Sequence, residues 1–556
     1  MRGLLTSSIG VTCAAALALP LTPPASAAPA PTAPSAEVAP VVAPDAPDLS
    51  GSTQSLPLTP LTRDRAAGAA EQGVPRRDVR PFSLLGVVWD DPDTDLDGTV
   101  QVRTRKTGTG AWSGWQDVET HYADHGADPD SAERASGHPR GATAPLWVGD
   151  SDGVEVRVRP DASHRAEGTV RGTRTPAAPA PLPAGLRLEL VDPGDTTTSA
   201  ARSKTAEAVP DTAVPDTAVP DTAVPDTAVP DTAVPDAVFP DTPDTATGAR
   251  HGADAPSGRT ADFLSAAALS DGTVLTADPA TTRTAPSAHS ARFIGAGTPR
   301  TAASAVSPSV AASAANAALA PLGASEISAL DAAGTRSELL ALRGGELTKA
   351  QRAKPYIGPR PRIVTRHGWG ADEKLRESGF RYTSTVKAAF VHHSATGNSY
   401  KCSQAPSVIR SIYRYHVKSL GWRDIGYNFV VDKCGTIYEG RAGGVAKAVL
   451  GAHTLGFNTN SMGIAVLGTF TSTKPSSATV KAVASLTAWK LGLFGGNPKG
   501  KTYLKSGGGN LYPKGKNVRL NVISGHRDGF ATECPGRQLY GKLGSARNTA
   551  ATYQGR

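Results

Sequence analysis

Two stretches of the chain alternate apolar and polar residues with the period of a half-buried β-strand. "TVQVRTRK", residues 99–106, and "GVEVRVRP", residues 153–160, each place valines on one face and charged side chains on the other. Shorter apolar runs lie around them, at "FSLLGVVWD", "PLWVGD" and "GLRLELV". This pattern predicts a small all-β module over residues 81–194, with the architecture of a sandwich.

Residues 355–556 change repeatedly between the strand period and the helix period. The apolar run 388–391 indicates a buried strand, and "SVIRSIYRYHVKSLGW", residues 407–422, has apolar residues at helical spacing. A hairpin with its turn at "DKCG" follows, then a second helix at "SSATVKAVASLTAWKLGLF" and a last strand that ends at His526. Strands that alternate with helices predict an α/β domain in which helices flank a central mixed β-sheet.

Two long segments show neither period. Residues 28–80 are rich in Pro and Ala, and residues 195–354 contain "VPDTA" five times in tandem from Val209. A proline in every unit excludes a continuous helix or a central strand, and solenoid repeats have much longer units. We therefore expect a disordered spacer at 28–80 and a low-complexity tether at 195–354, with one short helix near its end at "EISALDAAGTRSELLAL".

The first 27 residues have the features of a secretory signal peptide. Arg2 precedes a mostly apolar run, and "ASA" at residues 25–27 is a small-residue cleavage site. Cys13 lies in the apolar run and would be removed with it. No other apolar run is long enough to span a membrane. We therefore expect a secreted protein, extracellular or associated with a cell wall, with no stable membrane insertion.

The net charge of the chain, +8, is unevenly distributed. Residues 355–556 carry +21 and residues 1–354 carry −13. A basic secreted domain favours anionic surfaces, and because no nucleic-acid-binding motif is present we expect cell-wall polymers and not nucleic acid. General solubility is the alternative explanation. We expect a monomer.

Part of the positive charge lies in one stretch just before His526, "NPKGKTYLKSGGGNLYPKGKNVRL". Its Gly-rich centre predicts a hairpin or a long loop. The charged residues that flank this centre are Lys499, Lys501, Lys505, Lys514, Lys516 and Arg519.

Three cysteines remain after removal of the signal, Cys402, Cys434 and Cys534. In an oxidising compartment cysteines tend to pair, so one of the three needs another function. Cys534 lies in "SGHRDGFATECPG", eight residues after His526. It could be half of a disulfide, a nucleophile, a metal ligand or a buried thiol. A hydrolytic zinc site needs three protein ligands and one open position for water, and His nitrogen and Cys thiolate are good ligands.

Five motifs occur in a fixed order over residues 355–556: "FVHHSATG", "GWRDIGYNF", "DKCGTIYEGR", "GAHTLGFNTNSMGIAVLG" and "GHRDGFATECPG". With them, this region resembles the peptidoglycan recognition protein and type-2 N-acetylmuramoyl-L-alanine amidase superfamily. The resemblance implies a zinc ion held by the first histidine of "HH", the histidine of "GH" and the cysteine after it, here His392, His526 and Cys534. It also implies an enzyme, because members without catalysis have typically lost that cysteine.

The resemblance implies three further site residues. Tyr427 of "GYNF" and Thr532, two residues before the cysteine, match the family's other catalytic positions, and His453 of "GAH" matches a position that lines the substrate groove. A zinc ion would lower the pKa of its bound water and polarise the scissile carbonyl. Tyr427 and Thr532 would then stabilise the developing oxyanion.

The implied reaction is hydrolysis of the amide bond between N-acetylmuramic acid and the L-Ala of the stem peptide in peptidoglycan. No proton donor to the leaving nitrogen is evident, and Glu439 and Glu533 are candidates. With Cys534 assigned to the metal by the resemblance, Cys402 and Cys434 are left to form a disulfide between the helix and the hairpin. Two other functions stay open, peptidoglycan binding without cleavage and a cysteine hydrolase that uses the same Cys–His pair.

Overall fold

The computed structural model of the chain describes residues 51–61, 71–120, 122, 124–161, 181–194 and 306–556. The predicted signal peptide and the VPDTA repeats lie outside these residues. Among the described helices, none has both the length and the apolar character that a membrane crossing requires.

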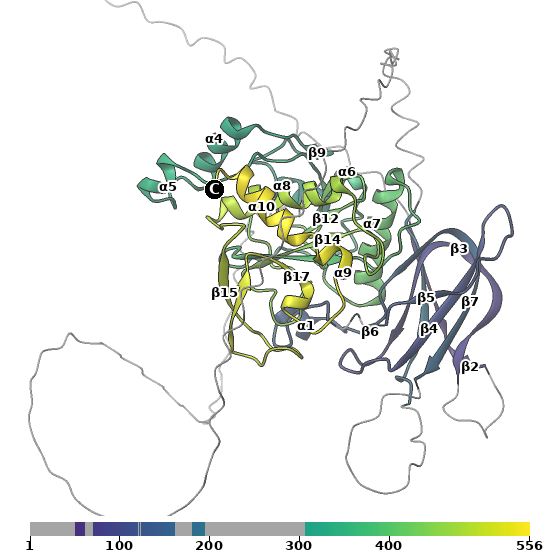
Figure 1. The fold of residues 1–556 in the computed structure, drawn as a ribbon. Coiled ribbons are helices and arrows are strands. Elements are labelled where there is room, and N and C mark those ends of the chain that lie inside the picture. The colour runs from purple at the N-terminus through teal and green to yellow at the C-terminus, as the bar shows by residue number, and fades with distance from the viewer. Residues whose placement is uncertain (1–50, 62–70, 121, 123, 162–180, 195–305) are drawn as a thin grey trace, which may run out of the picture. The chain divides into compact units, whose positions relative to one another are not determined.

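The N-terminal module is one antiparallel sheet of eight strands (Figure 1). Its strand order is β1-β8-β3-β7-β4-β5, and β2 and β6 pair with β3. The predicted alternation holds in the centre of the sheet, where Val100, Val102 and Val156 are completely buried. The elements are β1 (Ser52–Pro57), β2 (Thr59–Pro60), β3 (Gln72–Trp89), β4 (Gly98–Lys106), β5 (Gln116–Val118), the short helix α1 (Ala132–Ser136), β6 (Gly141–Ala142), β7 (Leu146–Pro160) and β8 (Arg187–Asp192).

The bounds of this module differ from the sequence prediction. It begins before residue 81, because β1 pairs with β8 along its whole length, from Ser52 opposite Asp192 to Pro57 opposite Arg187. Its strands are joined by backbone hydrogen bonds into one continuous sheet. The reason is the length of β3 and β7, 18 and 15 residues, which allows each to pair with several neighbours along its course.

The C-terminal domain is built on a mixed seven-stranded sheet in the order β17-β11-β14-β12-β13-β10-β9. Neighbours from β17 to β12 are parallel, β12 and β13 form the predicted antiparallel hairpin, and β10 is parallel to β13 but antiparallel to β9. The strands are β9 (Glu326–Ile327), β10 (Ile363–Val364), β11 (Ala388–His393), β12 (Phe429–Val431), β13 (Ile437–Glu439), β14 (Ser461–Val466) and β17 (Ile523–Gly525). A separate hairpin pairs β15 (Lys501–Lys505) with β16 (Asn517–Asn521) in the Lys-rich stretch.

Helices cover both faces of this sheet (Figure 1), which confirms the predicted α/β architecture. On one face Trp489 of α8 packs in a core with Ile464 of β14, and on the other Ile412 of α7 packs in a core with Ala465, the next residue of β14. The helices and helical turns are α3 (Pro308–Ala314), α4 (Ala332–Arg343), α5 (Lys349–Ala353), α6 (Arg366–Trp369), η2 (Cys402–Gln404), α7 (Ala405–Arg414), η3 (Tyr415–Ser419), α8 (Ser477–Leu493), η4 (His526–Asp528), α9 (Arg537–Tyr540) and α10 (Leu543–Tyr553).

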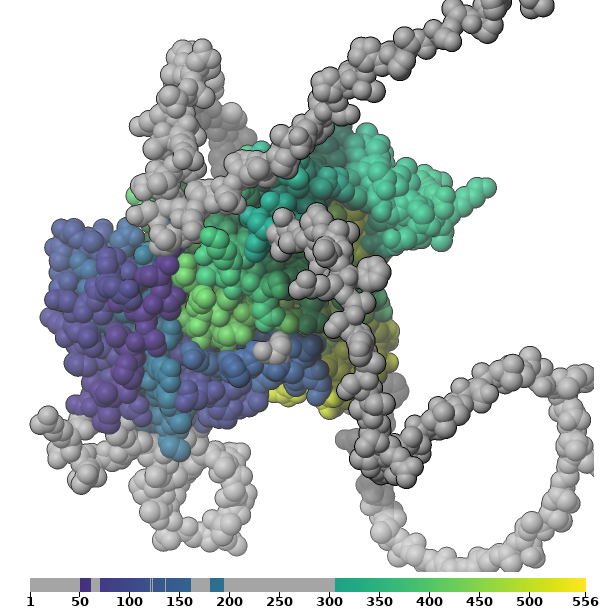
Figure 2. Space-filling model, turned by 180° about the vertical axis from the view of Figure 1, so that it is seen from behind, coloured from purple at the N-terminus to yellow at the C-terminus, as the bar shows by residue number. Residues whose placement is uncertain are grey.

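The C-terminal domain also begins earlier than predicted. Residues 306–353 were expected to belong to the tether, but β9 pairs with β10, with Ile327 opposite Ile363. Ile327 and Leu339 are buried in the core of the domain. In Figure 2 this teal segment lies against the green surface of the same domain. The predicted helix near the end of the tether is α4, which begins at the N-cap Asp331.

The predicted disulfide is present between Cys402 and Cys434, with a Cα–Cα distance of 6.3 Å. It ties η2, at the start of α7, to the turn between β12 and β13, and it closes a loop of 32 residues. The cross-link therefore joins a helix and a hairpin of the same domain.

Replacing both Cys402 and Cys434 by Ser should lower the free energy of unfolding by about 3 kcal/mol, because the open chain gains loop entropy in the unfolded state. Calorimetric unfolding of the full chain measures this, and the reduced wild type should behave like the double variant. An unchanged unfolding temperature would show that the cross-link does not constrain the unfolded chain.

Candidate metal centre

Two parallel strands bring two of the predicted ligands together. His392 lies at the end of β11, and His526 immediately follows β17. Val391 is opposite Gly525 in the register of these strands, so the next residue of each strand is one of the two histidines. Their ring centroids lie 4.4 Å apart. The carboxyl ends of parallel strands meet at one edge of a sheet, where binding sites commonly form.

Cys534 joins these histidines from the loop that follows η4. The backbone N–H of Arg527 donates to the Cys534 carbonyl (3.0 Å) and closes this loop. Cys534 Sγ lies 3.8 Å from His392 Nδ1, and its side chain is buried. The structure therefore brings together the three residues that the sequence motifs single out.

A fourth residue of the cluster, His125, was missed by the sequence analysis. It belongs to the segment between β5 and β6 of the N-terminal module. Its ligand atom and those of His392, His526 and Cys534 all lie within 4.8 Å of one another, and all four residues are buried. The only signal in the sequence is the concentration of His and Asp in "HYADHGADPD", which interrupts the strand pattern without indicating a partner.

Hydrogen bonds fix which ring nitrogens are free to bind a metal. His526 Nε2 donates to the backbone carbonyl of Asp124 (3.2 Å), and His125 Nδ1 donates to the carboxylate of the same residue (2.7 Å). Each ring thus keeps a lone pair on its other nitrogen, His526 Nδ1 and His125 Nε2. Both of these atoms are buried without a hydrogen-bond partner among the described residues. A bound cation would account for two buried polar atoms that are otherwise costly.

The electrostatics of the cluster also suit zinc. Burial lowers the pKa of His392 well below its usual value and that of His526 to about 3, so both imidazoles are neutral, as metal ligands must be. Burial raises the pKa of the Cys534 thiol, so metal binding has to displace its proton. Imidazole nitrogens and one thiolate sulfur form a donor set that zinc prefers.

His453, which the resemblance places in the lining of the substrate groove, lies behind His392. Its Nδ1 is 3.3 Å from His392 Nε2, its Nε2 is 3.3 Å from Ser461 Oγ, and its side chain is fully buried. Gly463 of β14 makes room for the ring, because a Cβ there would lie 2.3 Å from His453 Cγ. His453 therefore orients a metal ligand through its second ring nitrogen.

Tyr427 and Thr532 both lie beside the cluster. The Tyr427 ring centroid is 5.5 Å from that of His392, and its hydroxyl lies 3.2 Å from the hydroxyl of Tyr122. Thr532 Oγ1 accepts a hydrogen bond from the backbone N–H of Cys534 (3.2 Å). Tyr427 thus contacts the N-terminal module as well as the metal cluster.

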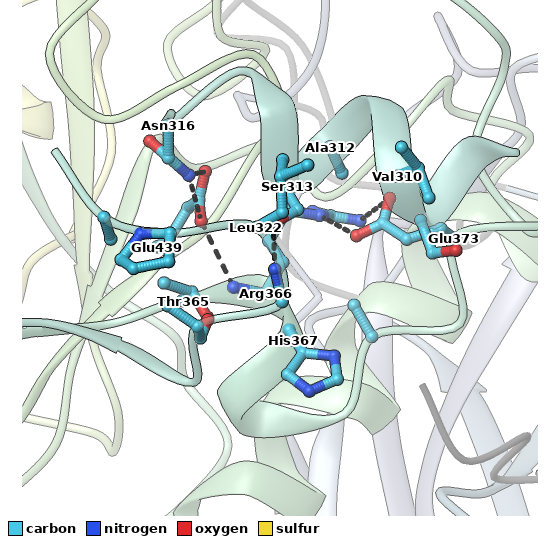
Figure 3. Close-up of a pocket in the computed structure, with 16 residues that line it drawn as sticks. Val310, Ala312, Ser313, Asn316, Leu322, Thr365, Arg366, His367, Glu373 and Glu439 are labelled. Carbon is cyan, nitrogen blue, oxygen red and sulfur yellow. Dashed lines mark hydrogen bonds and ion pairs between the residues drawn. The ribbon is translucent and has the colours of Figure 1, made fainter. Parts of the chain in front are cut away.

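Neither glutamate considered as a proton donor belongs to this site. Glu439 lines a separate pocket (Figure 3), in which both of its oxygens accept from Asn316 Nδ2 (2.9 and 3.0 Å) and one accepts from the Arg366 backbone N–H. Burial raises the pKa of Glu439 to about 7. Its hydrogen bonds hold Asn316, which lies just after α3, against β13. Glu533 is exposed and pairs with Arg527 (2.9 Å).

Comparison with known proteins identifies the C-terminal domain. A family model described as N-acetylmuramoyl-L-alanine amidase matches residues 382–537. Peptidoglycan-recognition protein SC2 of Drosophila simulans is 30% identical over 191 residues, which cover 34% of this chain and 88% of that protein. The chain belongs to the peptidoglycan-recognition protein and amidase family.

Other relatives match the amidase-family domain over similar or shorter stretches. Peptidoglycan-recognition protein LE of Drosophila melanogaster is 36% identical over 126 residues, 23% of this chain and 35% of that protein. A crystal structure of peptidoglycan recognition protein-LE in complex with tracheal cytotoxin is 29% identical and covers 33% of this chain and 92% of that chain, with a TM-score of 0.27. A second family model, described as Rv3811 N-terminal galactose-binding domain-like, matches residues 31–182.

The cluster predicts about one zinc ion per full-length chain, the stoichiometry of a single site of this type. Elemental analysis after dialysis against a weak chelator should show this ion, and Cys534→Ser should lower the zinc content because it removes the thiolate ligand. The matched control is the double replacement of Cys402 and Cys434 by Ser, which removes the other two described cysteines and should keep the metal. A zinc affinity of the Cys534→Ser protein equal to that of the wild type would exclude Cys534 as a ligand.

Proposed function

We propose that this protein is a secreted zinc-dependent N-acetylmuramoyl-L-alanine amidase that cleaves the bond between N-acetylmuramic acid and L-Ala in peptidoglycan. The observation that carries this proposal is the convergence of His392, His526 and Cys534 in a domain of the amidase family. The name of its relatives, peptidoglycan-recognition proteins, points to the same polymer. The Cys402–Cys434 disulfide supports an oxidising compartment outside the cell.

The three residues would hold the zinc ion, which supplies a Lewis acid for the carbonyl and lowers the pKa of a bound water toward ~7. Tyr427 would donate a hydrogen bond from its hydroxyl to the developing oxyanion. Burial raises the pKa of Tyr427 well above its usual value, so this proton is retained at neutral pH. Thr532 would act on the same oxyanion from the side of the Cys534 loop, while His453 keeps the His392 ring in place.

A cysteine hydrolase is disfavoured by the charge state of the same residues. A nucleophilic cysteine has to be a thiolate, which an adjacent imidazolium stabilises. Here burial raises the pKa of Cys534 and lowers the pKa values of His392 and His526, so the neutral forms of all three are favoured. A protein that binds peptidoglycan without cleaving it would not need Cys534 in a metal-binding arrangement, so this alternative is also disfavoured.

Prolonged digestion of purified peptidoglycan by the full chain tests this function through the identity of the bond that is cut. We expect new L-Ala amino termini and no new reducing ends of the glycan. 1,10-Phenanthroline should abolish the digestion and added zinc should restore it. New reducing ends, or digestion that a chelator does not affect, would contradict a zinc amidase.

In the same assay Tyr427→Phe should lower the initial rate by about 10²-fold or more, as loss of an oxyanion hydrogen bond does. Tyr438→Phe is the matched control, because Tyr438 is a buried tyrosine of the same domain whose hydroxyl donates to Asp432 (3.0 Å). Equal rates for the two variants would remove Tyr427 from the mechanism.

We also propose that the β15–β16 hairpin holds the enzyme on anionic wall polymers. The six Lys and Arg side chains in and just before this hairpin are all exposed. Lys514 pairs with Asp130 of the N-terminal module, so a clean test leaves it in place. The test replaces the other five residues, Lys499, Lys501, Lys505, Lys516 and Arg519, by Gln.

These replacements should weaken sedimentation of the protein with intact walls as strongly as added salt does, because screening limits electrostatic attraction to ~8 Å at physiological ionic strength. Turnover of a small soluble muropeptide should change much less and serves as the control. Wall binding that responds to neither treatment would assign the lysines to solubility alone.

A further inference from the structure

We infer that His125 is a fourth zinc ligand, and that the segment which carries it closes the active site and holds the full chain in an inactive state. We call this segment, residues 122–137, the plug; residue 123 lies outside the described residues. The inference rests on the proposed zinc amidase. To that proposal it adds a zinc ligand from the N-terminal module and a closed state of the full chain in which the enzyme is inactive.

The chemical argument concerns the number of protein ligands. A catalytic zinc ion keeps one coordination position for water, whereas four protein ligands make a closed site. With His125, the cluster offers three imidazoles and one thiolate within 4.8 Å of one another. Four protein ligands fill the coordination shell of a tetrahedral zinc ion, so the position of the reactive water is taken.

The plug is shaped to present His125. The bond from His125 Nδ1 to Asp124 fixes the tautomer and leaves Nε2 free, which is the usual arrangement of a metal-binding histidine. The His125 ring centroid lies 4.6 Å from that of His526 and 5.2 Å from that of His392. Gly126, the next residue, has φ +129°, a conformation that glycine adopts readily and other residues rarely do.

The plug also occupies the groups that would act on the substrate. Tyr122 OH lies 3.2 Å from Tyr427 OH and 2.7 Å from His416 Nε2, so the hydroxyl proposed for the oxyanion is already engaged. The Asp124 carbonyl accepts from the Leu455 backbone N–H (3.0 Å), beside the metal cluster. A substrate carbonyl that approaches Tyr427 therefore has to displace Tyr122.

Polar contacts hold the rest of the plug. Glu133 and Arg441 form a two-point ion pair (2.7 and 2.8 Å) in which each side chain is 6% exposed. The Asp128 carboxylate accepts from the Gly456 backbone N–H (2.8 Å) and from Asn458 Nδ2 (2.7 Å). Charged groups regain their hydration when they leave such a contact, so this surface is suited to opening.

Cobalt substitution of the full chain tests the ligand directly, because the spectrum of bound Co²⁺ reports its ligands without any turnover. The probe is acetohydroxamate, a small chelating ligand that needs open metal positions. The wild type should show the thiolate-to-cobalt band of Cys534 and little change on addition of the probe. His125→Ala should keep the thiolate band and bind the probe, while His138→Ala, which removes an exposed histidine just beyond the plug, should behave like the wild type.

A second variant keeps all four ligands and weakens only the ion pair between Glu133 of the plug and Arg441. Glu133→Gln should increase both probe binding and the rate on a soluble muropeptide, and His125→Ala should increase them further. If about one wild-type chain in a hundred is open at equilibrium, full release raises apparent probe affinity by up to ~100-fold.

Three results would overturn the inference, and they separate it from the proposed function. Probe binding by the wild type as tight as by His125→Ala would show that the site is already open. Loss of cobalt and of activity in His125→Ala would make His125 a permanent ligand of the working enzyme. Failure of every variant to show a thiolate-to-cobalt band would refute the zinc amidase itself, and the plug with it.

Discussion

Parallel pairing of β11 with β17 sets the distance between His392 and His526 before any metal is present. Because Val391 lies opposite Gly525, both histidines emerge at the same edge of the sheet. The cores on the two faces of the sheet, with Trp489 on one side and Ile412 on the other, keep this edge in place. Cys534 and His453 then need only short connections to reach the same point. The metal centre is thus a consequence of strand register.

The fixed positions of the histidines also explain why the N-terminal module can close the site. Each buried imidazole nitrogen that lacks a partner destabilises the folded protein by on the order of 1–3 kcal/mol. His125 and Asp124 add a ligand and satisfy His526 Nε2 in one contact. Away from the metal, ion pairs such as Glu133–Arg441 hold the plug, and these lose less on release to water than an apolar contact would. The chain therefore combines a permanent three-ligand site with a removable fourth ligand.

Local signals in the sequence were sufficient for most of the amidase-family domain. The helical period of α7 and the "DKCG" turn each depend on neighbours within a few residues, and both occur as predicted. β1 and β9 were missed because short segments in Pro- and Ala-rich sequence become strands only by pairing with β8 and β10. His125 was missed for the same physical reason, since its function comes from a tertiary contact with a different domain. A pattern along the chain carries no information about such a contact.

X-ray absorption at the zinc edge of the zinc-loaded full chain tests the four-ligand centre most directly. Multiple scattering from imidazole rings counts the histidines, and the distances separate sulfur at about 2.3 Å from nitrogen at about 2.0–2.1 Å. The account predicts three imidazoles and one sulfur in the wild type. Two imidazoles, one sulfur and one non-histidine oxygen would contradict it, because they would show that the site of the full chain is already open.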